Sequence, residues 1–198
     1  MRAATAGKII AAFGDDAIDV IENDPERLAT IKGITLKKAR EIAEEMQRVN
    51  GIRDLMAFLG SFGVRPEDAV KVWKAYGADS IACIQEDPYR LCSEQIAVDF
   101  AVADKLAESL EYDRANAERV KAGVLYVLRH NLLNGHTCLP ADKLCAAAAQ
   151  MLGVPLEDAQ AALYALCRDF DAVCENFNGR DFIFLPKQHR CEVYSADR

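Results

Sequence analysis

The chain has 198 residues, of which 51% are hydrophobic and 28% are charged, and its net charge at pH 7 is −7. These totals fit one or two small globular domains, and the negative balance excludes a protein that binds nucleic acid through a broad basic face. No apolar run approaches the ~20 residues that a membrane-spanning helix needs, so the sequence predicts no membrane partner.

Charge is uneven along the chain, with −1 over residues 1–50, −5 over 51–112 and −1 over 113–198. Any contact with nucleic acid is therefore expected to be local, made by backbone amides and a few lysines. The seven cysteines show no C-x-x-C spacing, and there are only three histidines. This pattern argues against a zinc site and favours reduced thiols in a cytoplasmic protein.

The first elements in chain order are predicted helices over residues 3–13, 15–22 and 25–30. Pro25 suits the first position of the third helix. The chain then turns at Gly33, which can adopt a backbone conformation that other residues resist. A longer helix is expected to begin near Thr35, which can cap it, and to run to about Val49.

One stretch of this region occurs twice. Residues 12–28 read AFGDDAIDVIENDPERL and residues 75–91 read AYGADSIACIQEDPYRL, with nine of seventeen positions identical at an offset of 63. An internal repeat of this kind indicates an architecture built from copies of one unit. We therefore expect roughly the first 110 residues to be one unit built twice.

The second copy adds predicted helices over residues 52–61, 66–76, 78–86 and 88–93, with a turn at Gly63. With one residue inserted, Ala97 aligns with Gly33 and Asp99 with Thr35. The same comparison aligns Met1 with Val64, inside a turn, so the first hairpin is expected to be truncated.

The pattern changes after residue 113. A long amphipathic helix over 114–134 is followed by helices over 140–152 and 155–170. Two alternating runs, 172–177 and 181–185, flank Asn178-Gly179, a strong signal for a tight β-hairpin. Three helices followed by a hairpin is the winged-helix order.

The predicted fold class is therefore mainly α, with tandem helix-hairpin-helix repeats followed by a winged-helix-like domain that carries a small β-hairpin. The predicted domains are a duplicated helix-hairpin-helix domain (1–112), a winged-helix-like domain (113–186) and a linker (187–198). The last residues, from Pro186 on, are expected to be either a helix or an extended linker with no further core.

The turn at Gly33 carries the clearest chemistry. Its pattern G-I-x-x-x-x-A-x-x-I resembles the helix-hairpin-helix family, in which backbone N–H groups at a turn and the following helix N-terminus bind a nucleic-acid phosphate. Such a contact carries no base specificity. The candidate DNA-binding residues are Lys32, Gly33, Ile34, Thr35, Lys37, Lys38, Gly63 and Arg65. In the later copy, a carboxylate at Asp99 should repel phosphate. The alternative for every hairpin is that it only packs helices together.

Other candidates are weaker. Trp73 and Tyr76 could stack on the bases of a single strand, but their helical spacing favours a place in the core. No G-x-x-x-x-G-K-[ST] loop occurs, and no residue set suggests catalysis or a metal site. The sequence therefore predicts no enzyme activity and no cofactor for these 198 residues.

The order of motifs resembles the region that precedes the motor in RecD-like ATP-dependent DNA helicases, of the exodeoxyribonuclease V alpha chain type. The segments that carry this resemblance are ENDPERL, KGITLKKAREI, EDPYRL, FAVADKLA, RVKAGVLYVLRHNLLNGHTCLPADKL and FIFLP. The resemblance implies a 5′-to-3′ helicase of DNA repair and recombination, whose ATP and Mg²⁺ sites lie in motor domains outside this sequence.

Two functions remain open. One is a non-catalytic accessory region that binds DNA weakly, single-stranded or at a junction, through its hairpin turns. The other is a protein-interaction or architectural module that docks on the helicase motor domains or on a repair partner, which the −5 charge of residues 51–112 favours for that part of the chain.

Overall fold

The structure is a computed structural model that describes residues 3–196. It divides into two compact units, Met1–Ile81 and Ala82–Arg198, each with its own core. Helices dominate both, and the described residues form one small sheet. The mainly α fold class predicted from the sequence is confirmed.

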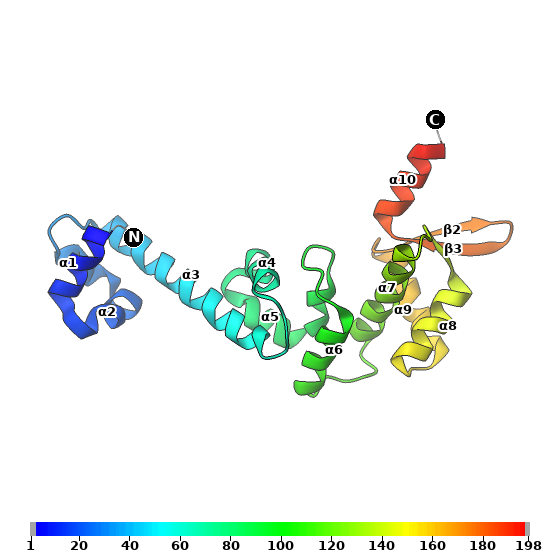
Figure 1. Cartoon of the computed structure of the whole chain (residues 1–198), viewed down its shortest axis with the longest axis horizontal. Helices are drawn as coiled ribbons and strands as arrows, with labels where there is room; N and C mark the ends of the chain where they lie inside the picture. Colours follow the sequence, from blue (N-terminus) through cyan, green and yellow to red (C-terminus); the bar gives the residue numbers. More distant parts are fainter. Residues whose placement is uncertain (1–2, 197–198) are drawn as a thin grey trace. The chain divides into compact units, whose positions relative to one another are not determined.

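The first unit is built on one long helix. Its elements are α1 (Ala3–Phe13), η1 (Gly14–Asp16), α2 (Ala17–Asn23), η2 (Pro25–Thr30), α3 (Leu36–Gly60), α4 (Pro66–Tyr76) and η3 (Gly77–Asp79). With 25 residues, α3 is about 37 Å long. Helices α1 and α2 gather near its N-terminal half and α4 packs on its C-terminal half (Figure 1). The first copy has a core that includes Ile9, Val20, Leu28 and Ile34.

The continuity of α3 corrects one prediction. The sequence indicated two helices with a break at Asn50-Gly51, but the helix runs through both residues. Glycine lowers helix propensity by about 1 kcal/mol, and packing overrides that cost here. The Trp73 ring of α4 lies directly against Gly51, so that a Cβ added there would come within 2.3 Å of Trp73 Cη2. The glycine is therefore explained by close helix packing and not by a break.

Gly51→Ala is accordingly expected to lower the free energy of unfolding by about 1 kcal/mol. Displacing the packed ring costs about 1–3 kcal/mol, partly offset by the better helix propensity of alanine. Urea denaturation would measure the change. Gly60→Ala is the matched control, because Gly60 also lies in α3 and a Cβ there meets nothing within 4 Å. Equal losses in both variants would contradict the packing argument.

The chain passes into the second unit within α5 (Ser80–Glu86). The following elements are η4 (Pro88–Cys92), α6 (Phe100–Ser109), α7 (Ala117–Leu133), β1 (Leu139–Pro140), α8 (Ala141–Leu152), α9 (Leu156–Arg168), β2 (Val173–Phe177), β3 (Arg180–Phe184) and α10 (Pro186–Ala196). Helices α7, α8 and α9 pack on one another (Figure 1), and α6 packs on η4. Fully buried leucines at 106, 128, 144 and 166 form much of this core.

The sheet is antiparallel with strand order β1-β3-β2. The β2–β3 hairpin pairs Phe177 with Arg180, and both turn residues, Asn178 and Gly179, have positive φ. The predicted Asn-Gly hairpin is therefore confirmed. The two-residue strand β1 was missed, because so short a run has no periodicity to detect.

Residues 187–198, predicted as a linker, are helical from Pro186 to Ala196. His189 of this helix contacts Phe184 and lies 2.9 Å from the Glu175 carboxylate. The predicted boundary at residues 112/113 rests on the sequence repeat, whereas the compact units rest on packing, so that boundary stays a prediction. The predicted truncation of the first hairpin falls on residues 1–2, outside the described residues.

Candidate nucleic-acid interface

Three turns of the chain share one geometry. The aligned positions Gly33, Gly63 and Ala97 all have positive φ, of +96°, +87° and +59°. The next residue in each is a buried aliphatic residue, Ile34, Val64 or Val98. The residue after that is an extended N-cap of a helix: Thr35, Arg65 or Asp99. The predicted alignment of Ala97 with Gly33 therefore agrees with the backbone, and the turn at Gly63 has the same three features.

The first turn leaves its helix N-terminus accessible to a ligand. The amide of Ile34 donates to the Ile31 carbonyl at 3.0 Å, which closes the turn around Gly33. Thr35 Oγ1 accepts the Lys38 amide at 3.3 Å, so only one of the first-turn N–H groups of α3 has a cap. Thr35 has φ −83° and ψ 160°, a conformation that any residue adopts.

Lysine side chains surround this turn. Lys32, Lys37 and Lys38 are exposed there. A fourth lysine, Lys8 of α1, donates from Nζ to the Lys32 carbonyl at 3.2 Å. A Cβ built on Gly33 would lie 3.5 Å from Lys8 Nζ. The helix N-terminus of α3 and the Lys8 ammonium group thus meet at one turn, and three more lysines lie within five residues of Gly33 in the sequence. This combination favours an anion.

Sequence reasoning missed Lys8, although a signal was present. Lys8 aligns with Lys71 of α4, and Lys71 forms an ion pair of 2.7 Å with Asp68. The residue that aligns with Asp68 is Thr5, which has no carboxylate. The lysine of the first copy is therefore available to the turn, whereas that of the second copy is held by its own helix.

The second turn is less suited to an anion. Arg65 donates to Asp68 at 2.9 Å, so the predicted phosphate ligand already has a carboxylate partner. Burial alone would raise the pKa of Asp68, but hydrogen bonds from Lys71 and Arg65 hold it below the usual value. Asp68 therefore stays ionised in the first turn of α4, and Pro66 removes one N–H donor from that turn.

In the third turn, the protein's own carboxylate occupies the helix N-terminus where an anion would bind. Asp99 caps α6, and its carboxylate accepts the Ala101 amide at 2.8 Å. A phosphate at this helix N-terminus would meet a negative charge. The geometry therefore agrees with the structural role predicted for this hairpin.

Ala97 is strained, because a side chain disfavours its left-handed backbone by about 1–2 kcal/mol. Ala97→Gly is expected to raise the free energy of unfolding by about 1 kcal/mol, after allowance for the greater unfolded-state entropy of glycine. Thermal unfolding would detect this as a higher midpoint. Ala101→Gly, in the helical and exposed first turn of α6, should instead lower the midpoint. Shifts of the same sign would contradict the strain at Ala97.

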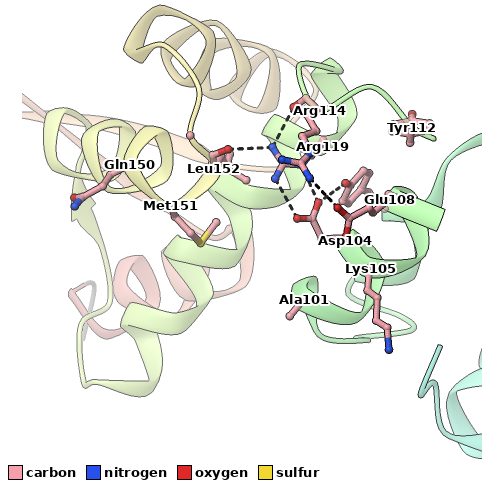
Figure 2. A pocket seen from close by; sticks show the side chains of 13 residues that line it. Ala101, Asp104, Lys105, Glu108, Tyr112, Arg114, Arg119, Gln150, Met151 and Leu152 are labelled. Atoms are coloured by element: carbon pink, nitrogen blue, oxygen red, sulfur yellow. Dashed lines mark hydrogen bonds and ion pairs between the residues drawn. The ribbon is translucent and has the colours of Figure 1, made fainter. Parts of the chain in front are cut away.

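The second unit contains a polar pocket of about 510 Å³ beside α6, α7 and the end of α8. Its centre is Arg119, which donates to both Asp104 oxygens at 2.8 and 3.0 Å and to the carbonyls of Arg114 and Leu152 at 3.0 and 3.2 Å (Figure 2). Tyr89 also donates to Asp104.

Burial would raise the pKa of Asp104, but the hydrogen bonds from Arg119 and Tyr89 outweigh it and lower that pKa. These charges are satisfied by one another, and Arg119 is only 8% exposed. The Arg119–Asp104 pair therefore links α6 to α7 and, through the Leu152 carbonyl, to the end of α8.

The other features considered from the sequence were base stacking by Trp73, a metal site and a membrane helix. Trp73 packs on Gly51, as its predicted place in the core requires. Among residues 3–196, no three histidine, cysteine or acidic side chains gather in a way that could hold a metal ion. Within the same span, no helix is both long and apolar enough to cross a bilayer.

Comparison with known proteins identifies the family. The sequence profile of the ATP-dependent RecD2 DNA helicase HHH domain matches residues 1–50 and 48–138. The ATP-dependent RecD2 DNA helicase of Deinococcus radiodurans is 28% identical over 139 residues, which cover 70% of this chain and 19% of that relative. The resemblance to RecD-like helicases drawn from the repeat and its hairpins is confirmed, and the chain belongs to the family of helix-hairpin-helix domains of ATP-dependent RecD2 DNA helicases.

Proposed function

We propose that the turn at Gly33 binds a phosphate of a DNA backbone. The observation that carries this proposal is the placement of Lys8, Lys32, Lys37 and Lys38 around the N-terminus of α3. The phosphate would accept hydrogen bonds from the first-turn amides and lie among the ammonium groups. Because the contact is to the backbone alone, binding would be independent of sequence.

The first copy of the repeat would do most of this binding. Gly63 and Arg65 of the second turn would contribute less, because Arg65 pairs with Asp68. The third turn would contribute nothing, because its own carboxylate caps the helix. The chain as a whole has net charge −7, so binding would be weak and confined to this turn.

On this proposal, the chain is a non-catalytic accessory region of a cytoplasmic helicase that acts in DNA repair and recombination. Its ligand would be single-stranded DNA or a junction. Residues 1–112 would form the duplicated helix-hairpin-helix domain and residues 113–186 a winged-helix-like domain. ATP and Mg²⁺ would serve the motor domains of the longer protein, since this chain has no phosphate-binding loop of the Walker type.

Fluorescence anisotropy with a labelled single-stranded oligonucleotide at ~50 mM salt, where phosphate contacts are strong, tests the proposal. Lys37→Glu combined with Lys38→Glu is expected to weaken binding by about tenfold or more, because two attractive charges become repulsive. Lys74→Glu with Lys143→Glu is the matched control, since both lysines are exposed and lie in α4 and α8. Absence of wild-type binding at this salt concentration, or an equal loss in the control, would refute the role of the turn.

A second function is favoured for residues 51–112 by their net charge of −5. These residues would form a protein-docking or architectural surface toward the helicase motor domains or a repair partner. A pull-down with purified motor domains tests this. If the motor domains still retain the Lys37→Glu, Lys38→Glu double variant, the protein contact is independent of DNA binding.

A further inference from the structure

The end of helix α9 is closed by a residue in an unfavourable backbone conformation. The Asp171 amide donates to the Leu166 carbonyl at 2.9 Å, and the Phe170 amide donates to the Cys167 carbonyl at 3.4 Å. This closure gives Phe170 a φ of +64°, in the left-handed region where glycine is the usual residue. Helix α8 has Gly153 at the matching position, with φ +67°. A bulky side chain there lowers the stability of the folded chain.

The Phe170 side chain does not offset this strain by packing, because it is 84% exposed. Within residues 3–196, positive φ occurs at four residues other than glycine, and Phe170 is the only aromatic one among them. An exposed hydrophobic residue alone would need no explanation. An exposed ring on a strained backbone, however, indicates a contact with something outside the chain.

Phe170 lines a groove of about 900 Å³ in the second unit. Helix α7 contributes Leu125 and Leu132 to the lining, and the start of α10 contributes Leu185 and Pro186. These four side chains are half-buried, so apolar surface lines the groove together with the Phe170 ring. The groove is therefore suited to an apolar side chain of a ligand.

A second unfavourable feature lies in the same groove. Gln188, in the first turn of α10, also lines it. The side-chain oxygen of Gln188 is buried, and it accepts no hydrogen bond from the part of the chain that the structure describes. A buried acceptor without a donor lowers stability, and most such groups in folded proteins have a partner. A ligand that covers Phe170 and donates an N–H to Gln188 Oε1 would remove both unfavourable features.

The charges of the groove favour a polypeptide over DNA. The lining has four basic and four acidic side chains, and Lys121 among them pairs with Glu118 at 3.0 Å. A phosphate would meet no excess of positive charge and has no N–H to donate to Gln188. A polypeptide has backbone N–H donors, and an apolar side chain of the same segment can pack on Phe170.

We propose that this groove binds a polypeptide segment of the helicase motor domains, with an apolar side chain on Phe170 and a backbone N–H directed to Gln188 Oε1. The inference rests on the docking function proposed above and deepens it by naming the residues that make the contact. Phe170 and Gln188 thus stabilise the complex and destabilise the free chain.

Phe170→Gly tests the proposal through two effects of opposite sign. In the free 198-residue chain, the midpoint of thermal unfolding is expected to rise by about 2 °C or more, because glycine relieves the left-handed strain. Binding to purified motor domains, measured by biolayer interferometry, is expected to weaken by about tenfold, because the ring is no longer buried in the complex. The control is Tyr164→Ala, at an exposed aromatic residue of α9 that does not line the groove. It should leave the Kd within about twofold of the wild type.

Gln188→Met removes the acceptor and keeps nearly the same size. The midpoint of the free chain should stay the same or rise, and binding to the motor domains should weaken by about threefold or more, because a hydrogen bond is lost. Unchanged binding in either variant would overturn the groove contact and leave the docking function standing. A lower midpoint for Phe170→Gly would also overturn it, because the ring would then stabilise the free chain.

Two further outcomes separate this inference from the functions on which it is built. No binding of the wild-type chain to the motor domains would refute the docking function and this proposal with it. The affinity of Phe170→Gly for a labelled single-stranded oligonucleotide should equal that of the wild type. A tenfold loss of that affinity would mean that the ring stacks on bases, and a polypeptide would then be the wrong occupant.

Discussion

Replacing Arg119 with alanine is expected to lower the free energy of unfolding by about 3 kcal/mol. The guanidinium of Arg119 binds both oxygens of Asp104 and two backbone carbonyls. Its removal leaves a carboxylate that Tyr89 alone cannot neutralise. The expected loss lies at the lower end of the range for buried pairs, because the Asp104 side chain is 32% exposed and water can partly replace the lost donors. Urea denaturation followed by circular dichroism would measure it.

The matched control is Arg48→Ala. Arg48 also binds both oxygens of a carboxylate, that of Glu45, at 2.7 and 2.9 Å, but its side chain and that of Glu45 are both more than half exposed. Exposed pairs contribute little to stability, because water screens their charges, so this variant should lose far less than Arg119→Ala. Comparable losses for the two arginines would mean that the Arg119–Asp104 pair is not what stabilises the second unit.

Much of the fold could be predicted from local patterns. The repeat identified equivalent segments, and glycine or proline marked their turns. The helices of both copies, apart from the break predicted at Gly51, and the Asn178-Gly179 hairpin were therefore located correctly. These features are encoded within a few residues. The Arg119–Asp104 pair could not be foreseen, because the two residues belong to different helices and only the folded chain brings them together.

The break predicted at Gly51 was wrong for the same reason: it depended on a contact between helices. A glycine in a helical pattern suggests an end of the helix, and only the Trp73 ring on the neighbouring helix reveals that the glycine makes room for packing. Local propensity amounts to about 1 kcal/mol, which tertiary contacts readily exceed. Continuity of a long helix was therefore decided by a contact that the local sequence does not encode.

The candidate site was predictable in its backbone and not in its full set of side chains. The conformations of Gly33 and Thr35 follow from the motif, and the lysines beside them in the sequence are exposed. Lys8 was not, because its position at the turn depends on how α1 packs. The missing carboxylate at Thr5, compared with Asp68, was the one clue in the sequence.

Thr35→Asp is expected to weaken DNA binding by about tenfold or more at ~50 mM salt without destabilising the protein. The substitution gives the first turn the carboxylate that Asp99 places at the third. Two unit charges about 5 Å apart repel by roughly 1–3 kcal/mol at effective dielectric constants between those of water and a protein surface, and 1.4 kcal/mol is a factor of ten in affinity. Aspartate caps a helix as well as threonine does, so α3 should keep its start. Anisotropy titrations and thermal unfolding of the same samples would measure both effects.

Thr35→Asn separates charge from shape. Asparagine has nearly the size of aspartate and is an equally good N-cap, but it carries no charge to repel a phosphate. It should therefore bind DNA within about threefold of the wild type, and the difference between the two variants should shrink as salt screens the repulsion. If Thr35→Asp and Thr35→Asn weaken binding equally, the loss comes from the altered shape of the turn, and the predicted charge repulsion is wrong. If neither variant changes binding, the phosphate is not held at the N-terminus of α3, and the lysines around it act only as a solvated surface.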